Sequence, residues 1–487
     1  MLSLLAGCLL TRVNHLYVLP KDLAQADRLL AESLQGLTAR QSPQIWIDNE
    51  GIDKIVLKNL KVDGYQTEDT SDVWSLVKTF KGQLQGAVLY KLGTHSVNVA
   101  TSLSGPLRAV AIDESQEEQA KAAGLRILVD TRTMTEQQAW DKYHQMFGKG
   151  IVVEQSIDKP GHLRDFAIKH WAFVMDTDDR EFRKRVIRES GTHPLVFGWG
   201  KSEYDWITDI SEAGGTGVAA DWCVNLSALE SLPVQLPKAI PPASAKNEDG
   251  VRYVAFVLSD GDNVQWVTGD FATNPKFYGS PLRGQFPMSW EMSPLLAQFA
   301  PRVLKAIYDQ AKPTDDFVTG PGLPGYTFPN LHKDREGLAK ITAPLLQASN
   351  MSIVSFLNQN EGQMTDTFPW LDLKDTTAAI YKDYSPYNRR QGETIWHNGK
   401  PCVSYRFLLW EGLTGIDDLV KQIGAMPTEP KRKNASYALI NVHAWSFGNS
   451  GGPIAAVKQV IDKLPPNTRV VTATQLLDLL VKNHPGD

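Results

Sequence analysis

The chain has 487 residues, of which 42% are hydrophobic and 22% charged, an ordinary balance for a soluble globular protein. This length is too great for one hydrophobic core and indicates roughly two to four domains. The formal net charge of −5 gives no electrostatic basis for a nucleic-acid partner, because proteins that bind nucleic acids present basic faces.

The N-terminal stretch MLSLLAGCLL is apolar, and its segment LAGC is similar to the cleavage box of bacterial lipoproteins. A working export signal needs a basic first region and a longer apolar core, and this stretch has neither. Either a trimmed leader or a buried N-terminal segment fits it, and we expect an exported protein, secreted or in the cell envelope. No stretch reaches the roughly 18 apolar residues of a membrane span, so we expect none.

Residues 1–145 alternate short apolar runs with amphipathic segments. The runs are at 15–19, 44–48, 86–90, 107–112 and 126–130, and amphipathic segments lie at 22–40 and 114–123. Alternation of this kind predicts a parallel sheet covered by helices, and hence a Rossmann-like α/β domain. The fingerprint G-x-G-x-x-G follows none of these strands, so the fold carries no signal for a dinucleotide cofactor.

Residues 146–231 form a second α/β region, with strands predicted at 172–175 and 194–199 and a charged helix at 178–189. The stretch LPVQLPKAIPPASAKNEDG at 232–250 is rich in proline, small residues and late charges, which is typical of a linker. We therefore place domain boundaries on both sides of it.

Residues 251–487 are expected to form one C-terminal domain. Strands are predicted at 253–258, 316–319, 353–357, 378–381, 403–409, 437–442 and 469–471, and helices between them include 293–310, 335–349 and 453–463. Seven strand–helix units in this length predict a distorted barrel of parallel strands. The predicted fold class is thus α/β, with Rossmann-like N-terminal regions and a barrel-like C-terminal domain.

Polar and aromatic side chains follow nearly every strand of this C-terminal domain. In parallel α/β folds, ligands bind beyond the carboxyl ends of the strands. The first strand runs directly into SDGDN, and a carboxylate at the end of a buried strand is costly unless it is hydrated, paired or bound. The resulting candidates for catalysis are Asp260, Asp262, Glu361, Glu411 and His443, and those for substrate binding are Asn263, Trp266, Glu291, Tyr326, His332, Asn358 and Trp445.

A rim of carboxylates, amides and flat aromatic rings suits a sugar, and its few cations disfavour a phosphorylated ligand. Glycoside hydrolysis normally needs two carboxyl groups on opposite sides of the scissile bond. Asp260 and Asp262 leave the same strand end and flank one point, so a partner from another strand is required. Glu361 and Glu411 are the best placed, and Glu291 is a third candidate, although an acid there also suits a helix N-terminus.

Two other functions remain open. Asp260, Asp262 and His443 could hold a divalent metal in a carbohydrate deacetylase or esterase, although no H-x-x-x-H or H-E-x-x-H pair accompanies them. A carbohydrate-binding protein without catalysis would also use an aromatic rim. For the glycosidase we expect a carbohydrate partner, no cofactor and no metal.

Several segments give the chain a resemblance to the GxGYxYP family. They are VLSDGDNVQW at 257–266, SPLLAQFAP at 293–301, PGYTFP at 324–329, NVHAWS at 441–446 and, in the preceding region, the stretch at 196–229. The family's own motif is altered, because Leu323 replaces its first glycine and Phe328 its second tyrosine, while Gly325, Tyr326 and Pro329 are kept. The resemblance implies a carbohydrate-active bacterial hydrolase with several N-terminal domains and an exported location.

Two expectations concern the site itself. Tyr326 lies between Gly325 and Pro329 just past a strand end, so we expect it to line the cleft. Gly261 allows the chain to turn between Asp260 and Asp262, so we expect the two to differ in function. At least one should face the same cavity as Glu361 and His443, while the other caps the following segment.

Overall fold

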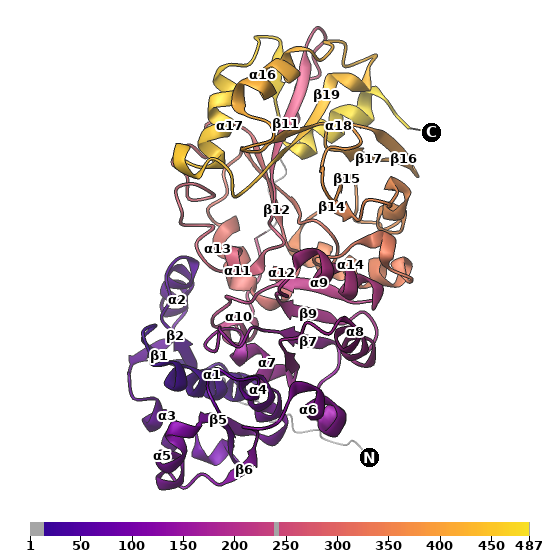
Figure 1. Ribbon diagram of the computed structural model, residues 1–487. Coiled ribbons are helices and arrows are strands. Elements are labelled where there is room, and N and C mark those ends of the chain that lie inside the picture. The colour runs from indigo at the N-terminus through magenta and orange to yellow at the C-terminus, as the bar shows by residue number, and fades with distance from the viewer. Residues whose placement is uncertain (1–13, 238–242, 487) are drawn as a thin grey trace, which may run out of the picture.

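The structure is a computed structural model that describes residues 14–237 and 243–486. The apolar start at residues 1–10, to which the export signal was assigned, lies outside the described residues. The sheets follow one another along a long axis, with the N-terminal strands at the bottom of Figure 1 and the C-terminal strands at the top. Within the described ranges, every helix is too short or too polar to span a membrane.

The first sheet is parallel and has the order β2-β1-β3. Its strands are β1 (His15–Leu19), β2 (Ile45–Ile47) and β3 (Gln66–Asp69), and its helices are α1 (Gln25–Ala39), α2 (Ile52–Val62) and α3 (Val73–Thr79). Helix α1 is buried over nearly its whole length because it contacts both this sheet and the next one. A helix covered on two sides needs apolar residues beyond a single stripe.

The second sheet is also parallel and has the order β5-β4-β6. Its strands are β4 (Gly86–Tyr90), β5 (Ala109–Asp113) and β6 (Ile127–Asp130), with helices α4 (Ser96–Leu107), α5 (Glu117–Ala122) and α6 (Glu136–Tyr143). The described residues 14–145 thus contain two separate three-stranded sheets, where the sequence predicts one sheet for residues 1–145. Local strand–helix alternation cannot distinguish these arrangements, since it does not specify which strands pair.

The third sheet has four parallel strands in the order β10-β9-β7-β8. The strands are β7 (Ile151–Glu154), β8 (Phe173–Met175), β9 (Leu195–Gly198) and β10 (Thr216–Ala219), and the helices are α7 (Arg164–His170), α8 (Arg180–Glu189), α9 (Glu203–Glu212) and α10 (Leu226–Glu230). The described parts of residues 232–250 contain neither helix nor strand. The domain boundaries drawn from the sequence stay predictions.

The C-terminal strands form two sheets. One is parallel, with the order β13-β12-β11-β19-β18 and with β20 also paired to β11; its strands are β11 (Arg252–Leu258), β12 (Met288–Met292), β13 (Asp315–Thr319), β18 (Phe407–Leu409), β19 (Tyr437–Val442) and β20 (Thr468–Val470). The other has the order β14-β15-β17-β16, with β14 (Ile353–Asn358), β15 (Ala378–Asp383), β16 (Thr394–His397) and β17 (Lys400–Ser404); only the β16–β17 pair is antiparallel.

Eight helices of the described C-terminal residues cover these sheets: α11 (Val264–Val267), α12 (Leu296–Phe299), α13 (Pro301–Tyr308), α14 (Arg335–Ser349), α15 (Phe368–Leu371), α16 (Ile416–Gly424), α17 (Pro453–Asp462) and α18 (Ala473–Asn483). Short 3₁₀ helices occur at Lys81–Gln83, Glu114–Gln116, His144–Met146, Pro329–Leu331, Met364–Thr367, Asn434–Ser436 and Gly448–Ser450. The helix predicted at 293–310 is divided into α12 and α13 at Pro301, which lacks a backbone N–H.

The α/β class and the mostly parallel pairing are confirmed, but the barrel is not seen as a closed ladder among the described residues. The two sheets meet on both sides. Pro321 forms a single bridge with Ser355 between β13 and β14, and the chain passes from β17 to β18 as Tyr405 N–H bonds Tyr381 and Arg406 N–H bonds Leu439. Strand β12 was not predicted, because its polar Ser289 and Glu291 are unlike the apolar runs of the other strands.

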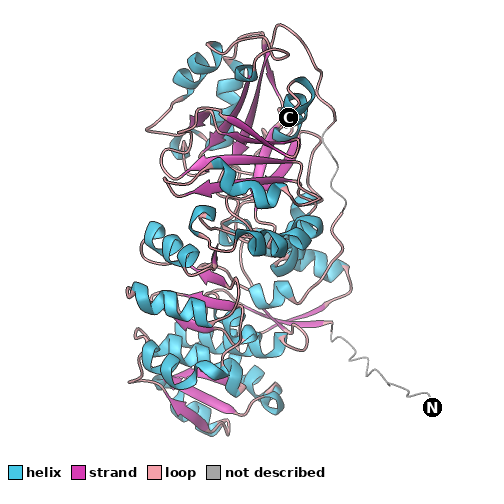
Figure 2. Cartoon of the chain, turned by 90° about the vertical axis from the view of Figure 1, so that its right-hand side faces the viewer, coloured by secondary structure: helices cyan, strands magenta, loops and turns pink. Residues whose placement is uncertain are grey.

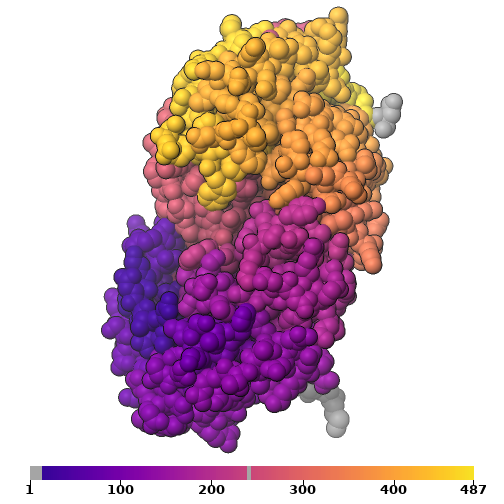
Figure 3. Space-filling model, viewed as in Figure 1, coloured from indigo at the N-terminus to yellow at the C-terminus, as the bar shows by residue number. Residues whose placement is uncertain are grey.

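The apolar core continues from the third sheet into the C-terminal half. Phe299 of α12 lies edge-on to Phe166 of α7 and to Phe197 of β9, with ring centroids 5.6 and 5.1 Å away. Figure 2 shows the sheets in successive layers separated by helices, and Figure 3 shows the third-sheet region in close contact with the C-terminal half. This shared core fixes the ends of the third sheet against the ends of the C-terminal strands.

Candidate functional site

A cavity of about 140 Å³ lies where strands from three sheets end. The third-sheet region contributes Trp199, Glu203 and Ala219; the C-terminal half contributes Asp260, Asp262, Asn263, Pro321, Tyr326, Leu357, Lys382, Tyr387 and Trp445. Each of the strands β9, β10, β11, β13, β14 and β15 delivers at least one of these residues at or just after its carboxyl end. This is the position at which parallel α/β sheets bind ligands.

The turn after β11 brings Asp260 and Asp262 together into the cavity. Asp260 has a positive φ of 68°, a conformation that aspartate adopts more readily than most residues. A Cβ on Gly261 would lie 1.6 Å from the carbonyl oxygen of Glu291, so only glycine lets the turn pack this closely against β12. Both aspartates line the cavity, whereas the sequence predicts that one of them caps the next segment.

The two aspartates hold their protons more tightly than ordinary carboxyls. Burial raises the pKa of Asp260 to about 6, against the opposing charge of Lys382. Burial and the neighbouring Asp260 raise the pKa of Asp262 well above its usual value. The Oδ2 atom of Asp260 is buried without a hydrogen-bond partner, which is costly for a carboxyl oxygen.

Lys382 and Glu291 form a buried ion pair beside the aspartates. The Lys382 ammonium lies 3.1 and 3.2 Å from the two Glu291 oxygens, and both side chains are at most 1% exposed. Ser355 and Tyr405 also donate to Oε1 of Glu291, at 2.8 and 3.3 Å. Glu291 is therefore a strand residue committed to an ion pair outside the cavity lining, and not the helix N-terminal acid that the sequence suggests.

Tyr326 connects the C-terminal half to the third sheet. Its backbone pairs with Gly217 of β10 through two hydrogen bonds of 2.7 and 2.8 Å, and its hydroxyl donates to Oε1 of Glu203 at 2.8 Å. A Cβ on Gly325 would lie 2.7 Å from the Gly217 carbonyl oxygen, so the glycine permits this close approach. Tyr326 is only 4% exposed, but it lines the same cavity as Asp260.

Aromatic and amide side chains complete the rim. Trp445 is 52% exposed and packs on Trp266, with ring centroids 4.8 Å apart. Trp266 itself is buried and does not line the cavity, so it supports Trp445 from behind. Asn263 lines the cavity and also caps α11, because its side chain accepts a hydrogen bond from the Trp266 N–H. The rim therefore presents a flat apolar surface beside acidic and amide groups.

Besides Glu291 and Trp266, five more predicted residues lie outside the cavity lining: Glu361, Glu411, His443, His332 and Asn358. Glu361 is exposed, and the exposed Glu411 accepts the Phe447 N–H at 2.7 Å. His332 is buried, bonds the Gly215 carbonyl at 2.8 Å, and has its pKa lowered to about 4 by burial. The predicted facing of Glu361 into the cavity is not seen in the lining, since the position of a residue at a strand end does not specify the direction of its side chain.

His443 and Asn358 are held in local structure. His443 stacks on Trp410 with ring centroids 3.7 Å apart, hydrogen-bonds Ser446 at 2.8 Å, and has its pKa lowered to about 4 by burial and Lys382. Asn358 is fully buried and donates to Gln363, Asp366 and Tyr381. His443 is thus near Lys382 but is not among the residues that line the cavity with the aspartates. In the described part of the chain, no three His, Cys, Asp or Glu side chains are grouped to hold a metal ion.

Sequence reasoning missed four polar or aromatic members of the site, Trp199, Glu203, Lys382 and Tyr387. The first two follow β9 in the stretch VFGWGKSE, which has the same strand-then-polar pattern as the C-terminal strands. The sequence signal for these two residues therefore lies outside residues 251–487, in the stretch after β9. Lys382 lies within β15, where nothing in the local sequence indicates its ion pair with Glu291.

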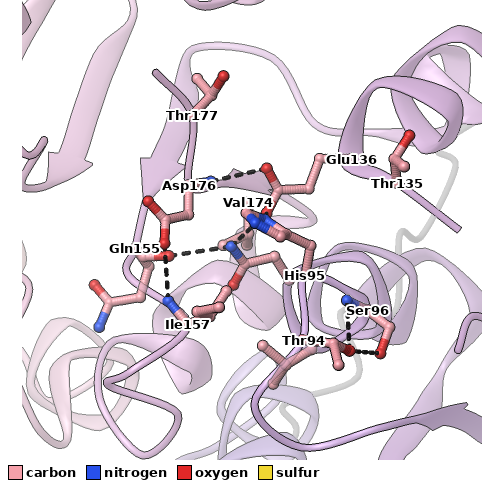
Figure 4. A network of polar contacts seen from close by, with 12 residues as sticks. Thr94, His95, Ser96, Thr135, Glu136, Gln155, Ile157, Val174, Asp176 and Thr177 are labelled. Atoms are coloured by element: carbon pink, nitrogen blue, oxygen red, sulfur yellow. Dashed lines mark hydrogen bonds and ion pairs between the residues drawn. The ribbon is translucent and has the colours of Figure 1, made fainter. Parts of the chain in front are cut away.

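A second hollow, of about 460 Å³, lies between the second and third sheets, at the ends of β4, β6 and β8. Its central acid is Glu136, which is 5% exposed. His95 Nδ1 lies 3.1 Å from Glu136 Oε1, and the Asp176 N–H donates to Oε2 at 2.9 Å (Figure 4). Asn98 also donates to Oε1, at 2.6 Å. Both oxygens of this buried carboxyl are thus satisfied by the protein.

Three matches identify the family. Residues 250–481 match the "GxGYxYP putative glycoside hydrolase C-terminal domain", residues 149–231 the GxGYxYP third domain, and residues 84–147 the GxGYxYP_N second domain. The chain belongs to the GxGYxYP family. A solved structure, described as that of "a putative hydrolase from Bacteroides thetaiotaomicron VPI-5482", is similar at 26% identity and a TM-score of 0.89, covering 98% of this chain and 96% of that one. A comparison with curated proteins finds no match.

Proposed function

We propose that the protein is a glycoside hydrolase that acts on a poly- or oligosaccharide in the cavity at Asp260 and Asp262. The observation that carries this proposal is the pair of carboxyls whose pKa values are raised within a cavity that also has exposed aromatic surface. Perturbed titrating groups in a cavity are a mark of catalytic sites. The family's C-terminal domain and the similar solved structure, both described as hydrolases, support the same reaction class.

Asp262 is the general acid in this proposal. Burial and the neighbouring Asp260 raise its pKa well above the usual value, which favours the protonated form that donates to the departing glycosidic oxygen. Asp260 assists indirectly. Once ionised, its negative charge raises the pKa of Asp262 and so holds the proton there. The positive charge of Lys382 acts in the opposite direction and lowers the pKa of both aspartates.

The size of the cavity favours a single sugar ring. Its volume of about 140 Å³ is well below the roughly 300–1,000 Å³ of sites that enclose drug-sized ligands. We propose that one terminal ring enters, while the rest of the chain leaves past the exposed Trp445. An indole face beside the opening can stack on the apolar side of a pyranose ring.

We also propose that the two C-terminal sheets are the two halves of one distorted barrel. The bridge from Pro321 to Ser355 and the passage of the chain from β17 to β18 support it, because they join the sheets on both sides. In such a barrel the cavity lies at the carboxyl-terminal mouth, where barrel enzymes have their active sites.

The test compares the wild-type protein with Asp262→Asn on oligosaccharides and on 2,4-dinitrophenyl glycosides. We expect Asp262→Asn to lower the rate on oligosaccharides by about 10²–10⁴-fold, the usual contribution of a general acid. The loss should be much smaller on dinitrophenyl glycosides, because dinitrophenolate departs without a proton. Asp375→Asn, an exposed aspartate before β15, is the control and should change neither rate.

Two outcomes contradict the proposal. Equal losses on both substrate types would exclude an acid role for Asp262. A wild-type protein that binds oligosaccharides but cleaves none of them would be a carbohydrate-binding protein instead.

A further inference from the structure

The cavity contains a third carboxyl group that comes from a different sheet. Asp260 and Asp262 are separated by one residue at one strand end, so together they reach a sugar from one side. Glycosidases need a second carboxyl on the opposite side of the scissile bond. Glu361 and Glu411 lie outside the cavity lining, and Glu291 is occupied by Lys382. Glu203 is the remaining acid of the described lining.

Glu203 is held in place from two directions. It is the first residue of α9, a position at which the helix dipole favours negative charge, and Ser202 caps the helix before it. The Tyr326 hydroxyl donates to its Oε1 at 2.8 Å, which fixes the carboxylate while no hydrogen bond to Oε2 is seen in the described residues. The charge of Glu203 contributes to the raised pKa of Asp260, so the two acids lie close enough to interact.

We propose that Glu203 is the second catalytic carboxylate, opposite Asp262, and that the third sheet is therefore part of the active site. This inference rests on the proposed glycoside hydrolase function. In the reaction, Asp262 gives its proton to the glycosidic oxygen as the bond from that oxygen to the anomeric carbon breaks. On the other side, Glu203 either takes a proton from the water that bonds to the anomeric carbon, or bonds to that carbon itself before water releases it.

Tyr326 is then a positioning residue. Its hydroxyl orients Glu203, and its backbone pairing with Gly217 fixes the loop against β10. Gly325 allows the pairing, since any side chain there would meet the Gly217 carbonyl. The kept part of the motif, Gly325 and Tyr326, thus acts on an acid located more than a hundred residues earlier in the chain.

The experiment uses the full chain, α- and β-linked 2,4-dinitrophenyl glycosides, and azide as a replacement nucleophile. We expect Glu203→Gln to lower kcat/KM by about 10²–10⁴-fold, with an unchanged unfolding temperature because Glu203 is exposed. In Glu203→Ala, azide should restore turnover by bonding to the anomeric carbon as dinitrophenolate leaves with the bond's electron pair. The glycosyl azide should have the inverted anomeric configuration, since azide takes the place of Glu203 opposite the leaving group.

Glu212→Gln, at the other end of the same helix, is the matched control, because its carboxylate faces Lys184 at 3.6 Å on the surface. The inference is overturned if Glu203→Gln keeps activity similar to that of this control. It is also overturned if azide yields no glycosyl azide, or one of retained configuration. Failure of the proposed function is distinct, since the wild-type protein would then cleave none of the glycosides.

Discussion

The cavity at Asp260 and the hollow at Glu136 are built alike but differ in how their acids are satisfied. Both lie at the carboxyl ends of parallel strands, and burial raises the pKa of an acid in each. The oxygens of Glu136 accept hydrogen bonds from Asn98, His95 and the backbone of Asp176. Asp260 keeps a buried oxygen without a partner. A polar hollow alone therefore does not mark a site; an acid with an unpaired oxygen that also faces a cavity is the stronger indication.

The largest expected effect is that of Lys382→Met, which removes the cation beside the cavity acids. The variant leaves Glu291 buried without its ion-pair partner, which typically costs about 3–5 kcal/mol of stability. Activity should also fall, because loss of the Lys382 charge raises the pKa of Asp260 further. Urea unfolding and a pH–rate profile measure both effects. Unchanged stability together with an unchanged pH–rate profile would contradict a buried Lys382–Glu291 ion pair that acts on Asp260.

Glu136→Ala tests the other side of the comparison. The substitution leaves the Asn98 amide and the Asp176 N–H without their acceptor in a buried place, which should cost about 2–3 kcal/mol. Hydrolysis per folded molecule should not change, because this acid belongs to the scaffold. A selective loss of activity without loss of stability would instead make the hollow at Glu136 a functional site.

Asp260→Asn should increase stability at neutral pH. The pKa of Asp260 is raised from 3.8 to about 6, so the folded state binds this proton more tightly than the unfolded state. The contribution of the Asp260 carboxyl to the free energy of unfolding is fully present below pH 3.8 and is lost as the pH rises to about 6. Removing the charge should therefore gain about 2–3 kcal/mol at pH 7 and nothing at pH 3.5. Asparagine also tolerates the positive φ. Urea unfolding at both pH values checks this, and a gain that does not depend on pH would contradict it.

Trp445→Ala should have the smallest effect, on substrate affinity alone. Its exposed ring lines the cavity, and loss of stacking should weaken oligosaccharide binding by about 1 kcal/mol, or roughly fivefold. Calorimetric titration with an oligosaccharide that the enzyme turns over slowly measures this. Leu413→Ala, another exposed apolar residue outside the cavity lining, is the control. Equal effects of the two variants would exclude Trp445 from the binding surface.

The sequence predicts the acids that the C-terminal strand β11 contributes to the cavity, but not the residues that the third sheet contributes. The buried run before SDGD, with its abrupt acids, correctly indicates a polar place at the end of β11, since strand periodicity and burial are local properties. Glu203, Lys382 and the true position of Glu291 depend on which strands meet in space, which no local pattern encodes. For the same reason β12 escaped prediction, because its polar residues face interior partners rather than water.

The pairing of Tyr326 with Gly217 has a consequence for how this chain can evolve. The loop that carries the family's motif completes an edge of β10, a strand encoded about a hundred residues earlier. A recombination event that transferred only the C-terminal half would leave two backbone groups unpaired and a tyrosine hydroxyl without its acceptor. The two segments are therefore expected to be inherited as one unit. A gene fusion that separates them would encode a C-terminal half that lacks the third-sheet side of the cavity.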